Sequence, residues 1–283
     1  MSNGPVQTVR LGISTCPNDT FAFHALIEKA VDWRGLNFEI ELLDIQQLND
    51  RLFAGGFDVA KASFHAALLL TDSCVVLPSG SALGFGVGPL LLAARSDQQP
   101  CDDSQVTLCP GRHTTAMMLF QIFYPHTTRV EQAVFSDIMP RLINRQADFG
   151  VCIHEGRFTW QDQNLSLVED LGTRWEATTG SPLPLGGIIA RRKLGDDVIG
   201  RVQAVIHDSI EYAIADRDAA LPTMRRYAQE FNDEVLMQHV DLYVNQWTRD
   251  LGDVGIGALK RLAQEARKVG IIGPQDELSV FKH

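Results

Sequence analysis

The fold is decided by a short apolar run that ends in polar residues, Ala147-Asp148-Phe149-Gly150-Val151-Cys152-Ile153-His154-Glu155-Gly156-Arg157. A run of this length, bounded by glycine and polar residues, predicts a buried strand. Open α/β sheets hold their ligands at the carboxyl ends of the strands, so this strand would deliver His154 to a cleft. Imidazole has an unperturbed pKa of about 6.5 and can take and return a proton near neutrality. The pattern makes His154 a candidate general base, and a structural histidine that bonds a backbone carbonyl is the alternative.

Strand-like and helix-like segments alternate on the N-terminal side of this run. The predicted strands are 9–14, 37–43, 57–62, 74–77, 90–94, 105–109 and 129–135, and the predicted helices are 20–30, 45–54, 64–71, 114–123 and 137–146. Alternation of this kind predicts mainly parallel sheets in an α/β protein. On the C-terminal side, the polar stretch 162–176 carries no predicted element and 185–191 predicts a strand.

The chain changes character beyond this last strand. Residues 196–269 are predicted to be helical, with Asp253 capping the last helix and one apolar face formed by Val202, Val205, Ile206 and Ile210. We expect two α/β lobes joined by crossing segments at 90–94 and 185–190, with the C-terminal helices packed on the first lobe. The large lobe would comprise 1–92 plus 191–283 and the small lobe 93–190, with the site in the cleft between them. A single doubly wound domain with a helical tail is the alternative.

Composition excludes several classes of function. The 283 residues include 35 acidic and 25 basic side chains with no Lys/Arg cluster, which argues against nucleic acid or an anionic membrane as partner. No run is long enough to span a bilayer and no secretory signal pattern is present, so a cytoplasmic protein is expected. The five cysteines form no Cys-x-x-Cys pair, which favours reduced thiols. The sequence leaves the oligomeric state open, a homodimer included.

Cofactor motifs are also missing. His154-Glu155 is followed by Gly-Arg-Phe, so the His-Glu-x-x-His zinc pattern is absent, and we expect no metal. The glycine-rich segment 84–88 lacks the spacing of a dinucleotide fingerprint, and no Gly-Lys-Ser/Thr indicates a nucleotide triphosphate site. The sequence therefore predicts chemistry without a cofactor.

Two predicted strand-to-helix junctions in the first half carry polar residues. In the first, Asn18 or Asp19 is expected to cap the helix while Pro17 stiffens the turn. In the second, Ser63 can cap the following helix and also offer its hydroxyl to the cleft, whereas His65 is expected to be packed inside. Capping and ligand contact are both compatible with these residues.

A third junction, Cys109 to Ala116, is the preferred anion site. Free backbone N–H groups at a helix start, together with the hydroxyls of Thr114 and Thr115, would cradle a carboxylate or phosphate. Arg112 and Arg157 are candidate carboxylate partners because guanidinium forks match that geometry, although solvated arginines are the commoner case. Glu155 could orient His154 or pair with Arg157.

Nothing near the candidate base suggests covalent catalysis. No Gly-x-Ser-x-Gly nucleophile elbow accompanies His154, and Cys152 lies inside the apolar strand, where a thiol is inert. The residues favour acid–base chemistry on a bound ligand.

The chain resembles the MqnD-type 1,4-dihydroxy-6-naphthoate synthases of the futalosine route to menaquinone, in its motifs Cys16-Pro17-Asn18-Asp19-Thr20-Phe21 and Ile153-His154-Glu155-Gly156-Arg157-Phe158. Further motifs fall where that family places them: Lys61-Ala62-Ser63, Gly111-Arg112-His113-Thr114-Thr115-Ala116, Pro184-Leu185-Gly186-Gly187 and Tyr243-Val244-Asn245. The likeness runs along nearly the whole chain, and the combination of motifs is more specific than any one of them.

The resemblance implies a fold like that of type II periplasmic binding proteins, used by a cytosolic enzyme. That family cleaves cyclic dehypoxanthinyl futalosine without a metal or organic cofactor. By position, His154 is similar to the general base of the family, and Ser63, Thr114 and Thr115 to its substrate contacts, with Asn18 a contact from the opposing lobe. Two alternatives stay open: a chorismate dehydratase of the same pathway, whose family lacks this pairing of motifs, and a binding protein that holds a small carboxylate without transforming it.

Overall fold

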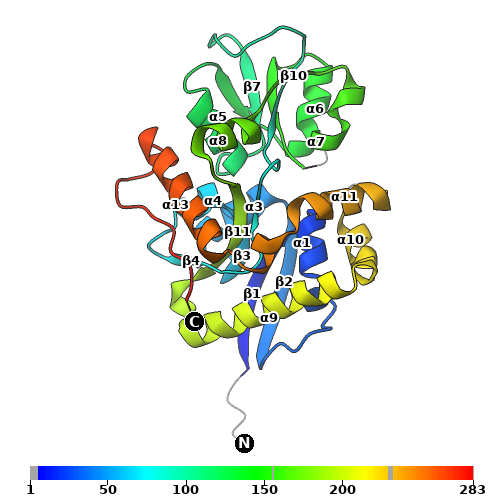
Figure 1. Cartoon of the computed structure of the whole chain (residues 1–283), viewed down its shortest axis with the longest axis vertical. Coiled ribbons are helices and arrows are strands. Elements are labelled where there is room, and N and C mark those ends of the chain that lie inside the picture. The colour runs from blue at the N-terminus through cyan, green and yellow to red at the C-terminus, as the bar shows by residue number, and fades with distance from the viewer. Residues whose placement is uncertain (1–5, 155, 229–231, 283) are drawn as a thin grey trace, which may run out of the picture.

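The protein is described here by a computed structural model that covers residues 6–154, 156–228 and 232–282. It contains two β-sheets, which form the lower and upper bodies in Figure 1. The six-stranded sheet has the order β2 (Leu36–Leu43), β1 (Gln7–Ser14), β3 (Val59–Ser63), β11 (Leu183–Arg191) and β4 (Cys74–Val76), with β5 (Ala82–Gly84) also paired to β11. The five-stranded sheet has the order β10 (Ser166–Asp170), β6 (Leu90–Ala93), β9 (Phe149–Cys152), β7 (Val106–Cys109) and β8 (Arg129–Gln132).

Both sheets are mixed, which corrects the prediction of mainly parallel sheets. The pairs β1–β2, β1–β3, β7–β8 and β7–β9 are parallel as the alternation predicted. β11 runs antiparallel to β3, β4 and β5, and β6 runs antiparallel to β9 and β10. Each of these two strands enters its sheet from the other body, so it runs opposite to the strands that belong to local strand–helix–strand units.

The predicted crossing segments are strands that lie inside one sheet each. Leu90–Ala93 is β6 of the five-stranded sheet and Leu183–Arg191 is β11 of the six-stranded sheet. The chain therefore passes between the sheets just before each strand, after β5 and after β10. The expected lobe boundaries at residues 92 and 190 stay a prediction.

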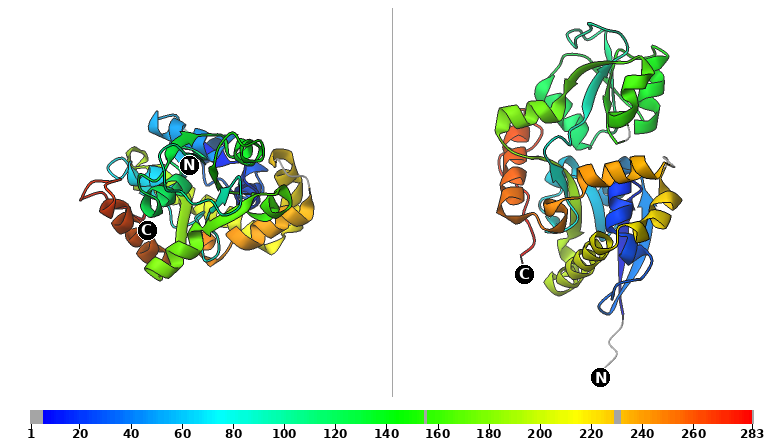
Figure 2. Two further views of the ribbon diagram at one scale, coloured as in Figure 1. Left: turned by 90° about the horizontal axis from the view of Figure 1, so that it is seen from above. Right: turned by 45° about the vertical axis from the view of Figure 1, so that its right-hand side comes forward.

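Helices cover both bodies (Figure 2). Around the six-stranded sheet lie α1 (Pro17–Ala22), α2 (His24–Ile27), α3 (Ile45–Phe53), α4 (Phe64–Leu68), α9 (Asp196–Ala215), α10 (Leu221–Tyr227), α11 (Asp233–Tyr243), α12 (Gln246–Arg249) and α13 (Gly252–Lys268). Around the five-stranded sheet lie α5 (Thr115–Phe123), α6 (Phe135–Ile143), α7 (Gly156–Thr159) and α8 (Leu171–Thr179). Short 3₁₀ turns occur at Trp160–Gln163, Arg192–Leu194 and Asp218–Ala220.

The longest helix confirms the predicted apolar face. Val202, Val205, Ile206 and Ile210 of α9 are fully buried in one cluster with the β1 side chains Val9, Leu11 and Ile13. Each such side chain contributes about 1.5–3 kcal/mol when removed from water, so this face holds α9 on the six-stranded sheet. None of the helices in the described ranges is long and apolar enough to cross a membrane.

Several local predictions are corrected by the structure. Residues 20–30 form two short helices, because Pro17 starts α1 at its first position and Phe23 interrupts the run. Cys16, not Asn18 or Asp19, is the N-cap of α1, and Leu251, not Asp253, precedes α13.

The polar stretch 162–176 contains two regular elements that were not predicted. It holds the edge strand β10 and most of α8. An edge strand can expose alternate polar side chains, so its sequence carries little of the hydrophobic signal on which the prediction depended.

Candidate active site

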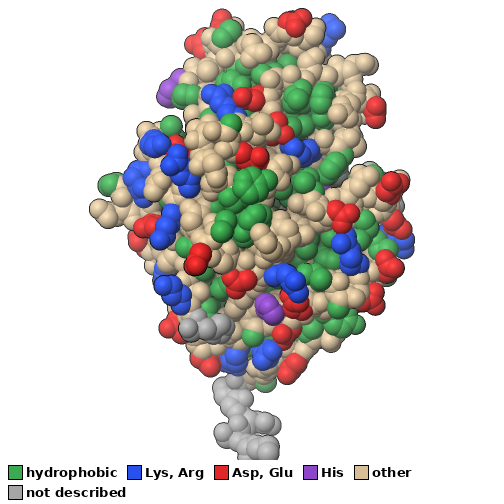
Figure 3. All heavy atoms as spheres, viewed as in Figure 1, with side chains coloured by type: hydrophobic (Ala, Val, Ile, Leu, Met, Phe, Trp, Pro, Cys, Tyr) green, Lys and Arg blue, Asp and Glu red, His purple; other side chains and the backbone are tan. Residues whose placement is uncertain are grey.

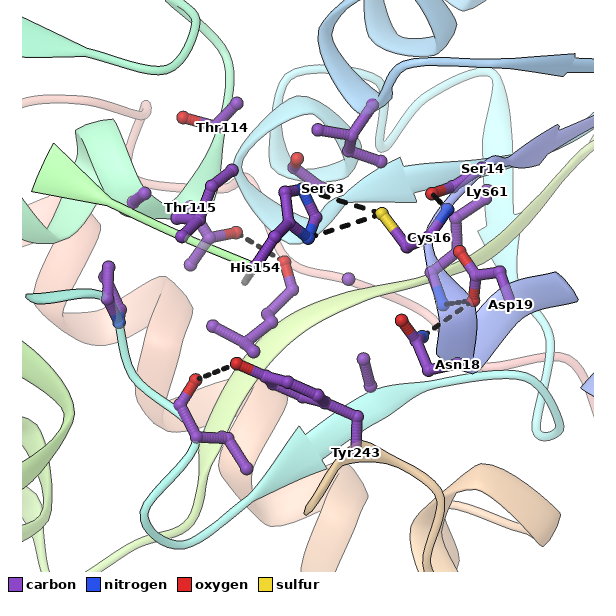
Figure 4. Close-up of a pocket in the computed structure, with 18 of the residues that line it drawn as sticks. Ser14, Cys16, Asn18, Asp19, Lys61, Ser63, Thr114, Thr115, His154 and Tyr243 are labelled. Carbon is purple, nitrogen blue, oxygen red and sulfur yellow. Dashed lines mark hydrogen bonds and ion pairs between the residues drawn. The ribbon is translucent and has the colours of Figure 1, made fainter. Parts of the chain in front are cut away.

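The predicted polar junctions meet at one cavity between the two bodies (Figure 4). It encloses about 680 Å³ of space not filled by atoms, part of it open to solvent. From the six-stranded sheet side it is lined by Cys16, Asn18 and Ser63, and from the five-stranded sheet side by Thr114, Thr115 and His154. Of the predicted site residues that the structure describes, all but Arg112 and Arg157 line this cavity.

His154 reaches this cavity from the turn after β9. Its backbone φ is +55°, in the left-handed region that a non-glycine residue seldom adopts and that often occurs at functional sites. The ring is partly exposed, and the edge of Phe135 packs against it at 4.7 Å between centroids. The prediction that a buried strand carries His154 into a cleft is confirmed. Glu155, its proposed partner, lies outside the described residues.

A thiol from the opposite body touches the imidazole. Cys16 Sγ lies 3.3 Å from Nδ1 and 3.5 Å from Nε2 of His154. The lone-pair directions of the two ring nitrogens diverge, so one sulfur almost equidistant from both lies in line with neither. The contact therefore spans the cleft without a well-aligned hydrogen bond to either nitrogen.

A buried ion pair forms the wall beside Asn18. Lys61 Nζ lies 2.6 Å from Asp19 Oδ1, and the two side chains are only 5% and 4% exposed. Lys61 also donates to the Gly80 carbonyl at 3.0 Å, and Asn18 Nδ2 donates to Asp19 Oδ1 at 3.0 Å. These bonds compensate the buried charges and fix the orientation of the Asn18 amide.

His239 of α11 also lines the cavity and was not predicted. Its Nε2 lies 3.1 Å from Asn18 Oδ1, and because that atom can only accept, Nε2 carries the proton. Burial, assisted by the nearby His154, holds the pKa of His239 well below its usual value, so the ring is neutral. Its ring centroid lies 6.3 Å from that of His154. No spacing or motif in the sequence linked His239 to the junctions, since it lies on a distant helix.

The three predicted hydroxyls are held in defined directions. Thr114 caps α5 by accepting from Met117 N at 3.2 Å, while Thr115 donates to the Leu185 carbonyl at 2.6 Å. Ser63 occupies the N-cap of α4 without a capping bond, and its hydroxyl instead accepts from Asn49 Nδ2 at 3.1 Å. α5 starts at the cavity, as the anion-site prediction requires.

His65 is packed behind this wall, as expected. It is 5% exposed, and its Nδ1 lies 3.1 Å from the Thr114 carbonyl oxygen. Burial lowers its pKa to about 4, so His65 is a neutral support for the start of α5. Burial also raises the pKa of Cys152 to about 12, which agrees with the exclusion of this thiol as a nucleophile.

The two arginines lie away from the cavity lining. Arg112 is exposed, and Arg157 binds Asp170 Oδ2 at 2.7 Å and the Gly88 carbonyl at 2.5 Å. The guanidinium of Arg157 binds a carboxylate as predicted, but that carboxylate belongs to the protein.

On the outer face shown in Figure 3, basic and acidic side chains are interspersed.

Fold and cavity together define a class of protein, the two-lobed α/β proteins with the periplasmic-binding-protein fold. The alkanesulfonate-binding protein SsuA from Xanthomonas axonopodis matches with a TM-score of 0.71 over 99% of both chains, at 13% identity. A protein from Archaeoglobus fulgidus matches with a TM-score of 0.89 and 29% identity, over 95% of this chain and 100% of its own. The two-lobe α/β fold predicted from the sequence is confirmed.

Sequence comparison identifies the family. A family model described as menaquinone biosynthesis matches residues 9–268. A 1,4-dihydroxy-6-naphtoate synthase from Thermus thermophilus is 40% identical over 269 residues, which is 95% of this chain and 97% of the relative. A protein of the same name from Streptomyces coelicolor is 36% identical, over 94% of this chain and 95% of its own. The chain belongs to the menaquinone biosynthesis family.

Proposed function

We propose that the protein is a 1,4-dihydroxy-6-naphthoate synthase, a carbon–carbon lyase that acts on cyclic dehypoxanthinyl futalosine in the cytoplasm. The observation that carries the proposal is the position of His154 at the cavity between the lobes of a chain whose two curated relatives both have this name. No cofactor, nucleic acid or membrane partner is part of the proposal. A homodimer is compatible with it.

His154 is proposed as the general base. It takes one proton from the bound substrate, and the electron pair left behind enters the ring that becomes aromatic. The electron pair of the broken carbon–carbon bond leaves with the released fragment. Formation of an aromatic ring makes this cleavage strongly favourable, so a base that typically contributes about 10²–10⁴-fold and precise positioning are sufficient. The imidazolium can return the proton to the released fragment.

Substrate contacts are proposed on both sides of the cavity. A carboxylate is held at the start of α5 by backbone N–H groups, where the helix dipole favours negative charge. Thr114 and Thr115 lie beside it, and each hydroxyl turns from its present acceptor, the Gly111 or Leu185 carbonyl, to the ligand. Ser63 and Asn18 contact the other end of the substrate. Arg157 is left out of this set because its guanidinium is already engaged with Asp170. Closure of the large lobe (1–92 plus 191–283) on the small lobe (93–190) excludes water.

Turnover of purified protein with cyclic dehypoxanthinyl futalosine tests the proposal. Mass spectrometry should detect 1,4-dihydroxy-6-naphthoate, and the variant His154→Ala should lose turnover by at least ~10²-fold while still binding substrate. His207→Ala, which removes an exposed imidazole on α9, is the matched control and should retain full activity.

Other outcomes identify the alternatives. Dehydration of chorismate, assayed in parallel, would replace the proposal with the sister activity of the pathway. Tight binding of cyclic dehypoxanthinyl futalosine or chorismate without turnover of either would indicate a protein that binds a small carboxylate and does not transform it. Undiminished turnover by His154→Ala would remove the base assignment while keeping the reaction.

A further inference from the structure

The segment that joins β5 to β6, and so passes between the sheets, touches the junction of β10 and α8 at a pair of glycines. A Cβ atom placed on Gly88 would lie 2.2 Å from the Cα of Gly172, and one on Gly172 would lie 2.6 Å from the Cα of Gly88. Leu171 N also donates to the Pro89 carbonyl at 3.0 Å. No side chain fits between these backbones, so the point where the two segments meet is defined by direct main-chain contact.

Arg157 binds both segments at this point. One guanidinium nitrogen donates to the Gly88 carbonyl at 2.5 Å and the other to Asp170 Oδ2 at 2.7 Å. The other oxygen of Asp170 accepts from Gly172 N at 2.9 Å and Thr173 N at 3.1 Å, which caps α8. The Arg157 and Asp170 side chains are 17% and 19% exposed, so the pair is partly shielded from water. Two separate nitrogens of the planar fork make these contacts, and the single ammonium nitrogen of a lysine cannot occupy both positions.

The same arginine is attached to the turn that carries His154. Arg157 N donates to the His154 carbonyl at 3.2 Å, and Arg157 lies in α7, the short helix that follows the turn. Gly88 and Pro89 line the cavity that His154 faces. The main chain of Arg157 therefore holds the turn that carries His154, while its side chain holds the β5–β6 segment at Gly88 and the end of β10 at Asp170.

We propose that Arg157 is a positioning residue that couples the placement of His154 to the β5–β6 segment, which passes between the sheets, and to the junction of β10 and α8. A shift of the β5–β6 segment at Gly88 is transmitted through the guanidinium to the His154 turn, so base placement and lobe arrangement change together. This inference rests on the proposed function for its kinetic consequence, but the mechanical coupling stands independently of the reaction.

Arg157→Lys tests the coupling, because it keeps the charge but loses the double contact. We expect kcat to fall about 10- to 100-fold with KM changed less than threefold, since a misplaced base loses rate while the substrate contacts remain. Arg141→Lys is the matched control: Arg141 pairs with Glu131 at 3.1 Å on the same body, but Glu131 lies on β8, at the opposite edge of the sheet from β10. The control should keep both constants.

Hydrogen exchange of the ligand-free proteins provides a readout that does not require turnover. Arg157→Lys should speed exchange at Leu171 N, which donates to the Pro89 carbonyl, together with the amides of α7, and Arg141→Lys should change neither. If Arg157→Lys folds poorly, Asp170→Asn keeps an oxygen for the α8 cap while it removes the charge and should give the same pattern. Unchanged exchange at either place overturns the coupling, whether or not the wild type is active. If the wild type shows no turnover but the variants show the expected exchange pattern, the proposed function is refuted and the coupling stands.

Discussion

The ion pair between Lys61 and Asp19 offers a quantitative test of how the cavity wall is held together. Asp19→Asn removes one charge from a pair whose side chains are 5% and 4% exposed, and it leaves a buried ammonium group without its counter-ion. Loss of one partner of a buried pair costs about 3–5 kcal/mol. The Gly80 carbonyl, 3.0 Å from Lys61 Nζ, remains as a partner, so we expect the lower end, about 3 kcal/mol.

Urea unfolding at pH 7, followed by tryptophan fluorescence, measures this loss in the free energy of unfolding. In a thermal scan the same loss should lower Tm by about 6–12 °C for a protein of this size. The double variant Asp19→Asn/Lys61→Met removes both charges and should be more stable than Asp19→Asn alone. Asp241→Asn, in the exposed pair with Arg217, is the control and should change stability little.

Two results would refute this reasoning. The first is an Asp19→Asn variant within about 1 kcal/mol of the wild type, which is the range of exposed ion pairs. The second is a double variant less stable than the single one, because it would show that the buried ammonium group needs no counter-ion.

Further predictions concern stability around the site. Burial lowers the pKa of His65 to about 4, so the unfolded chain binds a proton that the folded protein does not. The contribution of His65 to the free energy of unfolding should therefore be at its highest above pH 6.5 and fall by up to about 1.4 kcal/mol per pH unit towards pH 4. Urea titrations should show a shallower decline for His65→Gln than for the wild type. Thr115→Val leaves the Leu185 carbonyl without its donor and should cost about 1–3 kcal/mol in the same assay, with Thr115→Ser close to wild type. Gly172→Ala forces a methyl group against backbone and should destabilise by about 1–3 kcal/mol, whereas Gly257→Ala in α13, with nothing within 4 Å, should stabilise slightly; equal Tm values for the two would contradict the packing argument.

The sequence predicted what depends on local periodicity. The apolar face of α9 and the buried strand that leads to His154 follow from patterns a few residues long, and both occur in the structure. The polar junctions were recognisable because parallel α/β sheets place strand ends at the ligand edge. For that reason Ser63, Thr114 and His154 could be grouped before their distances were known.

Features that depend on distant contacts were not predictable in this way. His239 is fixed by Asn18, which is 221 residues away in the chain, and no local pattern links them. The guanidinium of Arg157 binds a carboxylate, as its chemistry suggested. Whether that carboxylate belongs to Asp170 or to a substrate depends on how the end of β10 lies relative to α7, which no local pattern predicts. The direction of β6 and β11 likewise depends on the path between the lobes.

The central claim is that His154 acts on a ligand held in the cavity, and a crystal structure of the wild-type protein with 1,4-dihydroxy-6-naphthoate tests it most directly. We expect a ring nitrogen of His154 within about 2.6–3.2 Å of a ligand hydroxyl oxygen, with the ligand carboxylate at Thr114 and Thr115. A ligand bound outside this cavity, or a His154 ring that makes no contact with it, would contradict the account.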